Sequence, residues 1–119
     1  MPVALFDSLS AGLARALTFH HQRHEILATN IANIETPGYR AQDLEFKDAL
    51  RNAFTSPEQE TGEPRVIDKP SGIARPDRNT VDVDMEMARL ADNRATYTAL
   101  AEILARRLAG LRRAIESSR

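Results

Sequence analysis

The sequence predicts an all-α fold in which two long antiparallel, coiled-coil-like helices are joined by an irregular loop with one short helix. Apolar residues recur every seven positions at both ends of the chain, which is typical of long amphipathic helices. Between them, residues 36–80 hold five of the six prolines and three of the five glycines, which favour a loop. We expect segments 1–35, 36–80 and 81–119 to form one structural domain.

The composition limits the functions that this chain can have. Its 119 residues allow one small domain, and a net charge of −1 provides no general attraction for nucleic acid. Cysteine is absent, so the sequence has neither a disulfide framework nor a thiolate site. No apolar run is long enough to span a bilayer, and the first residues do not resemble a cleaved secretory signal. We therefore expect no nucleic-acid partner and no direct membrane insertion.

Residues 1–35 are expected to form the first long helix. After Pro2 the segment has no proline and only one glycine, Gly12. Large or apolar residues follow one another at steps of seven, which places them on one face. These residues are Phe6, Leu13, His20, Leu27 and Ile34.

Residues 36–80 are expected to be mostly irregular. One island, 43–54, spaces its apolar residues four apart and predicts a short helix with Asp43 as N-cap. The stretch 64–77 has too many prolines for a central strand, so we expect an extended loop with, at most, an edge pairing.

Residues 81–119 are expected to form the second long helix. Asp82, Asp84 and Glu86 precede or open it, and we interpret them as N-terminal capping rather than as a catalytic pair. Arg94 interrupts a seam that otherwise repeats over more than four heptads. The predicted seam consists of Val83, Met87, Leu90, Tyr97, Leu104, Leu108, Leu111 and Ile115. Because each long helix has a wide apolar stripe, we expect a marginally stable monomer and a stable assembly.

Two asparagines near the end of the first helix need an explanation, because asparagine is unfavourable inside helices. Asn30 and Asn33 lie three residues apart, where their amides can bond to the last helical carbonyls or to an adjoining subunit. Pro37 then ends the helix, and Gly38 can supply the positive φ of a type II turn. The segment is either a locally capped helix end or a device that fixes the register of packed helices.

Other candidate sites are weaker. His20 and His24 are spaced to chelate a divalent metal, with His21 and Glu25 close by, but a polar patch on the helix is the simpler interpretation. The arginines near the C-terminal end suit the helix dipole better than a nucleic-acid site. We find no phosphate loop, nucleophile elbow or catalytic pairing, and expect a protein without cofactors that is not an enzyme.

The segment "ATNIANIETPGYRAQDLEF" resembles the N-terminal signature of bacterial flagellar basal-body rod proteins. The short length of the whole chain and its C-terminal segment resemble the proximal rod subunits in particular. The residues that match the signature are Ala28, Asn30, Ile31, Ala32, Asn33, Thr36, Pro37, Gly38, Tyr39, Arg40 and Ala41.

The resemblance implies a structural subunit that transmits torque from the MS ring toward the distal rod and hook and forms part of the export channel. Implied partners are copies of itself, other rod subunits, the MS ring, the ring-to-rod adaptor and the flagellar type III export gate. Such a subunit is exported unfolded, without a cleaved signal peptide, and folds in the periplasmic rod. The alternative is a soluble helical adaptor or export chaperone that remains in the cytosol.

Overall fold

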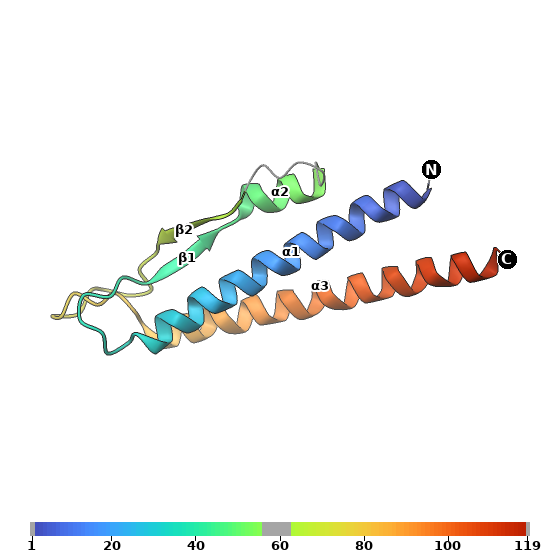
Figure 1. Ribbon diagram of the computed structural model, residues 1–119. Coiled ribbons are helices and arrows are strands. Elements are labelled where there is room, and N and C mark those ends of the chain that lie inside the picture. Colours follow the sequence, from blue (N-terminus) through green and yellow to red (C-terminus); the bar gives the residue numbers. More distant parts are fainter. Residues whose placement is uncertain (1, 56–62, 119) are drawn as a thin grey trace.

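The computed structural model describes residues 2–55 and 63–118, which form three helices and two short strands. Helix α1 (Pro2–Ala32) and helix α3 (Val83–Ser117) are antiparallel, and both chain ends lie at the same end of the molecule (Figure 1). The molecule is elongated and measures 67 × 25 × 15 Å. The predicted pair of long helices is confirmed, and a two-stranded sheet is added to it.

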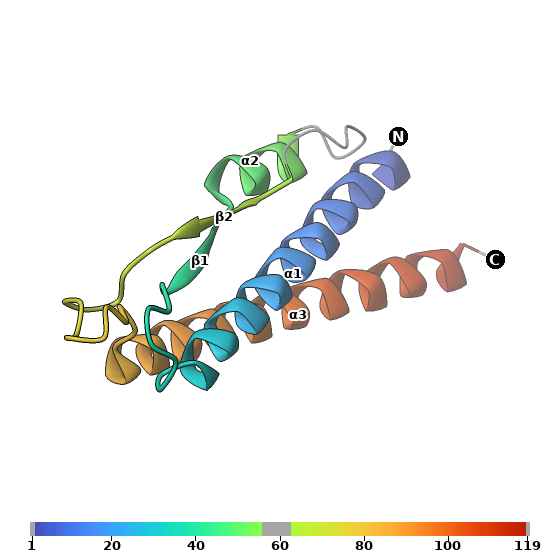
Figure 2. The ribbon, with the colours of Figure 1, turned by 60° about the vertical axis from the view of Figure 1, so that its left-hand side comes forward.

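The two ends of this helix pair differ in how closely the helices approach. We call the end where α1 stops and α3 starts the turn end, and the opposite end, where the chain starts and stops, the terminal end. The helices lie side by side at the turn end and separate toward the terminal end (Figures 1 and 2). The contacts that hold the pair together therefore concentrate at the turn end.

The first helix ends at Ala32, three residues before the predicted boundary. The backbone N–H of Asn33 still bonds to the carbonyl oxygens of Thr29 and Asn30 at 3.1 Å, but Ile34 bonds only three residues back, to Ile31. The last turn thus tightens before the Pro37 segment, as helix ends commonly do.

The middle segment corrects one prediction. Strand β1 (Gln42–Glu45) pairs antiparallel with strand β2 (Arg65–Asp68), and Gln42 lies opposite Asp68. The predicted short helix starts later, as α2 (Lys47–Thr55). Asp43 is therefore not its N-cap but a residue of β1, where its side chain bonds to Arg23 of α1. The expected edge pairing of the 64–77 stretch is confirmed.

A small apolar core joins α2 to α1. Phe19 of α1 packs against Ala49 and Ala53, with Phe46 and Leu50 partly buried beside them. A methyl group on Gly12 would lie 2.8 Å from a ring carbon of Phe54 and 3.0 Å from the Ala53 carbonyl oxygen. The absence of a side chain at position 12 thus lets α2 approach α1, on the face of α1 that is turned away from α3 (Figure 2).

Helix α3 presents a different face to α1 than the heptad pattern predicts. Its only buried residues are Glu86 and Asn93, neither of which belongs to the predicted seam. Leu90, Leu104 and Leu111 are partly buried. The other predicted seam residues are exposed: Val83 by 39%, Met87 by 52%, Tyr97 by 39%, Leu108 by 50% and Ile115 by 56%.

The start of α3 follows the prediction in part. The Asp82 carboxylate accepts a hydrogen bond from the backbone N–H of Met85, so Asp82 is the N-cap. Glu86, which was grouped with it, is instead buried between the helices. Within residues 2–55 and 63–118, no helix combines the length and apolar character needed to cross a membrane.

Candidate functional site

The candidate site is the turn end, beginning with the tight turn that follows α1. The Tyr39 backbone N–H donates to the Thr36 carbonyl at 3.2 Å, and Gly38 has φ +73°. These are the bond and the positive φ expected for a type II turn with proline at its second position. The Gly38 N–H also bonds to the Asp77 carbonyl at 2.8 Å, which ties this turn to the loop before α3.

Asn33 caps the end of α1 locally. Its side-chain amide donates to the Thr29 carbonyl at 2.8 Å, and its side-chain oxygen accepts from the Thr36 hydroxyl at 3.0 Å. The Thr29 carbonyl, in the last turn of the helix, also accepts the Asn33 backbone N–H at 3.1 Å. Asn33 therefore gives this carbonyl a second hydrogen bond and positions the turn residue Thr36.

Asn79 joins the loop before α3 to the end of α1. It is fully buried, and its amide nitrogen lies 3.0, 3.2 and 2.8 Å from the carbonyl oxygens of Asn33, Ile34 and Thr36. Its side-chain oxygen accepts from the Val81 N–H at 2.8 Å. One side chain thus serves as a C-cap for α1 and fixes the backbone that leads into α3.

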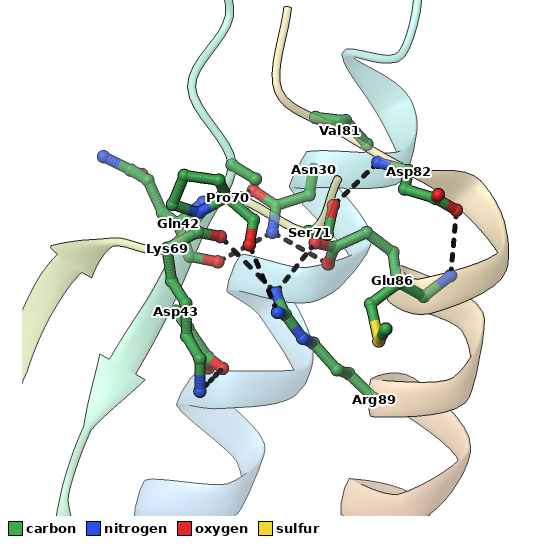
Figure 3. A network of polar contacts seen from close by, with 12 residues as sticks. Asn30, Gln42, Asp43, Lys69, Pro70, Ser71, Val81, Asp82, Glu86 and Arg89 are labelled. Atoms are coloured by element: carbon green, nitrogen blue, oxygen red, sulfur yellow. Dashed lines mark hydrogen bonds and ion pairs between the residues drawn. The ribbon is translucent and has the colours of Figure 1, made fainter. Parts of the chain in front are cut away.

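Asn30 connects three elements (Figure 3). Its fully buried amide donates to the Gln42 carbonyl at 2.7 Å and to the Glu86 carboxylate at 2.9 Å. Its oxygen accepts from the Gln42 N–H at 3.0 Å and from the Tyr39 hydroxyl at 3.3 Å. All four of these bonds lie within the chain. Asn30 fixes α1 against β1 and α3.

The Glu86 carboxylate is fully buried between the helices. Besides Asn30, it contacts Arg89, whose guanidinium lies 3.3 Å from it and also donates to the carbonyls of Lys69 and Pro70 (Figure 3). A buried charge is tolerated only when it is paired and hydrogen-bonded, as here. Burial, and then the negative charge of Glu86, raise the pKa of Tyr39 above its usual value.

A second buried carboxylate holds the sheet to α1. Asp43 accepts two hydrogen bonds from the Arg23 guanidinium, at 2.8 and 3.1 Å, and one from the Leu44 N–H at 2.7 Å. Burial opposes ionisation of Asp43. The bonds from Arg23 and Leu44, with the charges of Arg23 and Lys69, outweigh it and lower the pKa below its usual value.

The second buried polar residue of α3 follows Glu86 by seven positions. The Asn93 amide donates to the His20 carbonyl at 2.7 Å, and its oxygen lies 2.7 Å from His20 Nδ1. Because the amide nitrogen must face the carbonyl, the amide oxygen faces the ring, and Nδ1 carries the proton. The interface between α1 and α3 thus has polar layers at Glu86 and at Asn93.

The predicted motif residues converge on the turn end but do not share one environment. Asn30 is buried, Ile31, Asn33 and Tyr39 are partly buried, and Ala32, Thr36, Pro37, Gly38 and Arg40 are exposed. Arg40 forms an exposed ion pair with Asp68 at 3.5 Å.

Sequence reasoning missed two partners of the motif, Asn79 and Glu86. It also missed the Asn93 bonds to His20 and the Arg23 bonds to Asp43. The only available signal was that Glu86 and Asn93 are polar residues spaced by one heptad. In the part of the chain that the structure describes, no three His, Cys, Asp or Glu side chains are grouped so that they could hold a metal ion.

Comparison with known proteins gives consistent matches over most of the chain. The flagellar basal body rod protein FlgB of Salmonella typhimurium is 35% identical, with 90% of this chain and 94% of that protein covered. The chain belongs to the FlgB family. FlgB of Escherichia coli K12 is 32% identical, with 95% and 99% covered, and FlgB of Proteus mirabilis is 36% identical, with 71% and 76% covered.

No protein-family model matches the chain. Membership of the FlgB family places it in the flagellar basal body rod. In this FlgB-family chain, the signature segment recognised in the sequence forms the turn end, where it joins α1 to the sheet and to α3.

Proposed function

We propose that this chain is a structural, non-enzymatic subunit of the proximal rod. It transmits torque from the MS ring toward the distal rod and hook and forms part of the wall of the export channel. Its shape supports this role, because a slender helix pair of 67 × 25 × 15 Å can pack side by side with others into a tube.

The observation that carries the proposal is the apolar surface that α3 leaves exposed. Met87, Leu108 and Ile115 are each at least half exposed, and Ile103 is 48% exposed. A long helix with apolar side chains on several faces is stable in water only when neighbouring helices cover them. In the proposed rod, helices of adjoining subunits provide this cover.

The polar layers between α1 and α3 fit a subunit that must be exported unfolded. Glu86 and Asn93 occupy positions where apolar residues would stabilise the pair more. The free chain is therefore marginally stable, passes the flagellar type III export gate unfolded, and folds in the periplasmic space as it joins the rod. Its neighbours are copies of itself, other rod subunits, the MS ring and the ring-to-rod adaptor.

The exposed members of the signature motif are proposed as contacts between subunits. Ala32, Thr36, Pro37 and Arg40 lie on the surface of the turn end, whereas Asn30 and Asn79 hold the fold beneath them. This division separates residues needed for folding from residues that meet neighbours. Substitutions of Ala32 and Arg40, which lie outside the Thr36–Tyr39 turn, should reduce rod assembly without changing the fold.

The test is electron microscopy of basal bodies from a strain that lacks this chain, together with a swimming assay. We expect MS rings without rods and no swimming, and both defects corrected when the wild-type chain is supplied on a plasmid. Complete flagella on swimming cells would overturn the proposal and favour a cytosolic adaptor or export chaperone. Such an adaptor would also remain in the cytosolic fraction.

A further inference from the structure

A cleft of about 390 Å³ lies between α1 and α3 beside the Asn93 layer, and the proposed function does not use it. It is unusual in this chain because all three histidines line it. From α1 it is lined by His20, His21 and His24, and from α3 by Asn93, Arg94 and Tyr97.

The Asn93 side chain selects one tautomer of the neutral His20 ring. The Nδ1–H group donates to the Asn93 side-chain oxygen, with 2.7 Å between the nitrogen and the oxygen. The unshared electron pair of the neutral ring therefore lies on Nε2. Histidines that bind metals usually donate their other ring N–H to a fixed acceptor, which orients the ring and raises its basicity. Asn93 provides such an acceptor here.

His24 lies one helical turn after His20, on the same face of α1, and lines the same cleft. In the described part of the chain, its side chain has no hydrogen bond or ion pair. A spacing of four residues between two histidines is the one that helices use to place both rings on a single ion. His24 is therefore available to act with His20.

The neighbouring His21 is engaged elsewhere. Its Nε2 lies 3.2 Å from the Glu25 carboxylate, and the two side chains are 63% and 67% exposed. It thus provides a matched control, because it is a histidine on the same helix with a different partner.

We propose that His20 and His24 together bind one late first-row transition metal ion, of the class of Ni²⁺, Cu²⁺ and Zn²⁺. Imidazole suits these ions, and water completes the coordination because the described residues of the cleft supply two ligands. The site is consequently exchangeable rather than structural. The positive charge of Arg94, which also lines the cleft, weakens binding.

The test is isothermal titration calorimetry of the full chain, without a polyhistidine tag, with nickel chloride. We expect one Ni²⁺ per chain. The His24→Gln change should lower the association constant about tenfold or more. His21→Gln should leave it unchanged. Arg94→Gln should raise it about threefold, as expected for removal of an exposed like charge.

Circular dichroism of each variant without metal checks that the helices are intact. Nickel should raise the helix signal or the melting temperature of the wild-type chain and of His21→Gln, but not of His24→Gln. Absence of binding up to millimolar nickel would overturn the proposal. So would loss of binding in His21→Gln with retention in His24→Gln, which would assign the ion to the His21–Glu25 pair.

Discussion

The two ends of the same helix pair are built differently. At the turn end, Asn30, Asn79 and Glu86 are fully buried and their polar atoms are bonded within the chain. Beyond Asn93, toward the terminal end, α3 has no buried residue, although its apolar side chains continue to Ile115. The chain thus specifies its turn end by itself and, toward the terminal end, covers α1 with α2 but leaves α3 to be covered by neighbours.

The largest effect is expected from removing the Asn30 amide. The Asn30→Ala change would leave the Gln42 backbone and the Glu86 carboxylate without a buried partner, at a cost of about 3–5 kcal/mol. Thermal unfolding followed by circular dichroism measures this loss. The control is Asn33→Ala, which removes a partly exposed cap and should cost only about 1 kcal/mol. Equal losses would contradict the importance of the buried network.

The second effect concerns the link between α1 and the loop before α3. Asn79→Ala should destabilise the chain by about 2–3 kcal/mol, because the carbonyls at the end of α1 lose their common donor. Asn52→Ala, in a partly exposed position of α2, should change stability by about 0.5 kcal/mol or less. Denaturation midpoints of the two variants compare these sites directly. A harmless Asn79→Ala would show that the cap is dispensable.

Two glycine-to-alanine substitutions, one at each end of the helix pair, should change the free energy of unfolding in opposite directions. Gly38→Ala forces a side chain into φ +73° and should cost about 1–2 kcal/mol. Gly110 lies inside α3 with no neighbouring atom within 4 Å of an added methyl group. Gly110→Ala should therefore stabilise the helix by about 0.5–1 kcal/mol. Melting temperatures that shift in the same direction would refute this contrast.

The Asp43–Arg23 pair predicts how stability depends on pH. The pKa of Asp43 is lower in the folded chain than its usual 3.8. The stability that ionised Asp43 contributes is therefore complete above pH 3.8. This stability is lost as the pH falls below 3.8 and through the lower folded-state pKa, because protonated Asp43 no longer accepts both bonds from Arg23. Acid unfolding should therefore be less steep in Asp43→Asn. Identical pH profiles below 4 would contradict the linkage.

The smallest effect on folding is expected at the terminal end. Leu108→Ser with Ile115→Ser should change the stability of the free chain by about 0.5 kcal/mol or less, because both residues are at least half exposed. The same variant should prevent rod formation in cells, as judged by electron microscopy. Ile73→Ser, at an exposed loop position outside α3, is the control. Rods of normal frequency in the double variant would show that this surface is not an interface.

The sequence was sufficient to predict the long helices and the turn, because their signals are local. Heptad spacing, Pro37 and Gly38 act within a few residues, and the structure has the helix pair and the positive φ at the expected places. The end of α1 and the start of α2 were shifted. In both cases a group distant in the sequence is bound there: Asn79 bonds to the carbonyls at the end of α1, and Arg23 bonds to Asp43 in β1.

The polar layers could not be predicted, because their partners are far apart in the sequence. Asn30 and Glu86 are separated by 56 positions, and His20 and Asn93 by 73. Hydrophobic periodicity placed the α3 seam on apolar residues, whereas the face toward α1 carries a carboxylate and an amide. Such residues are stable inside only because specific partners meet them, which no local pattern reveals.

Hydrogen–deuterium exchange of the free chain in solution tests the difference between the two ends most directly. The backbone amides around Asn30 and between Glu86 and Asn93 should exchange most slowly. Those between Leu104 and Ile115 should exchange rapidly and become protected in isolated rods. Uniform protection along α3 in the free chain would contradict the account, because the terminal end would then be stable without neighbours.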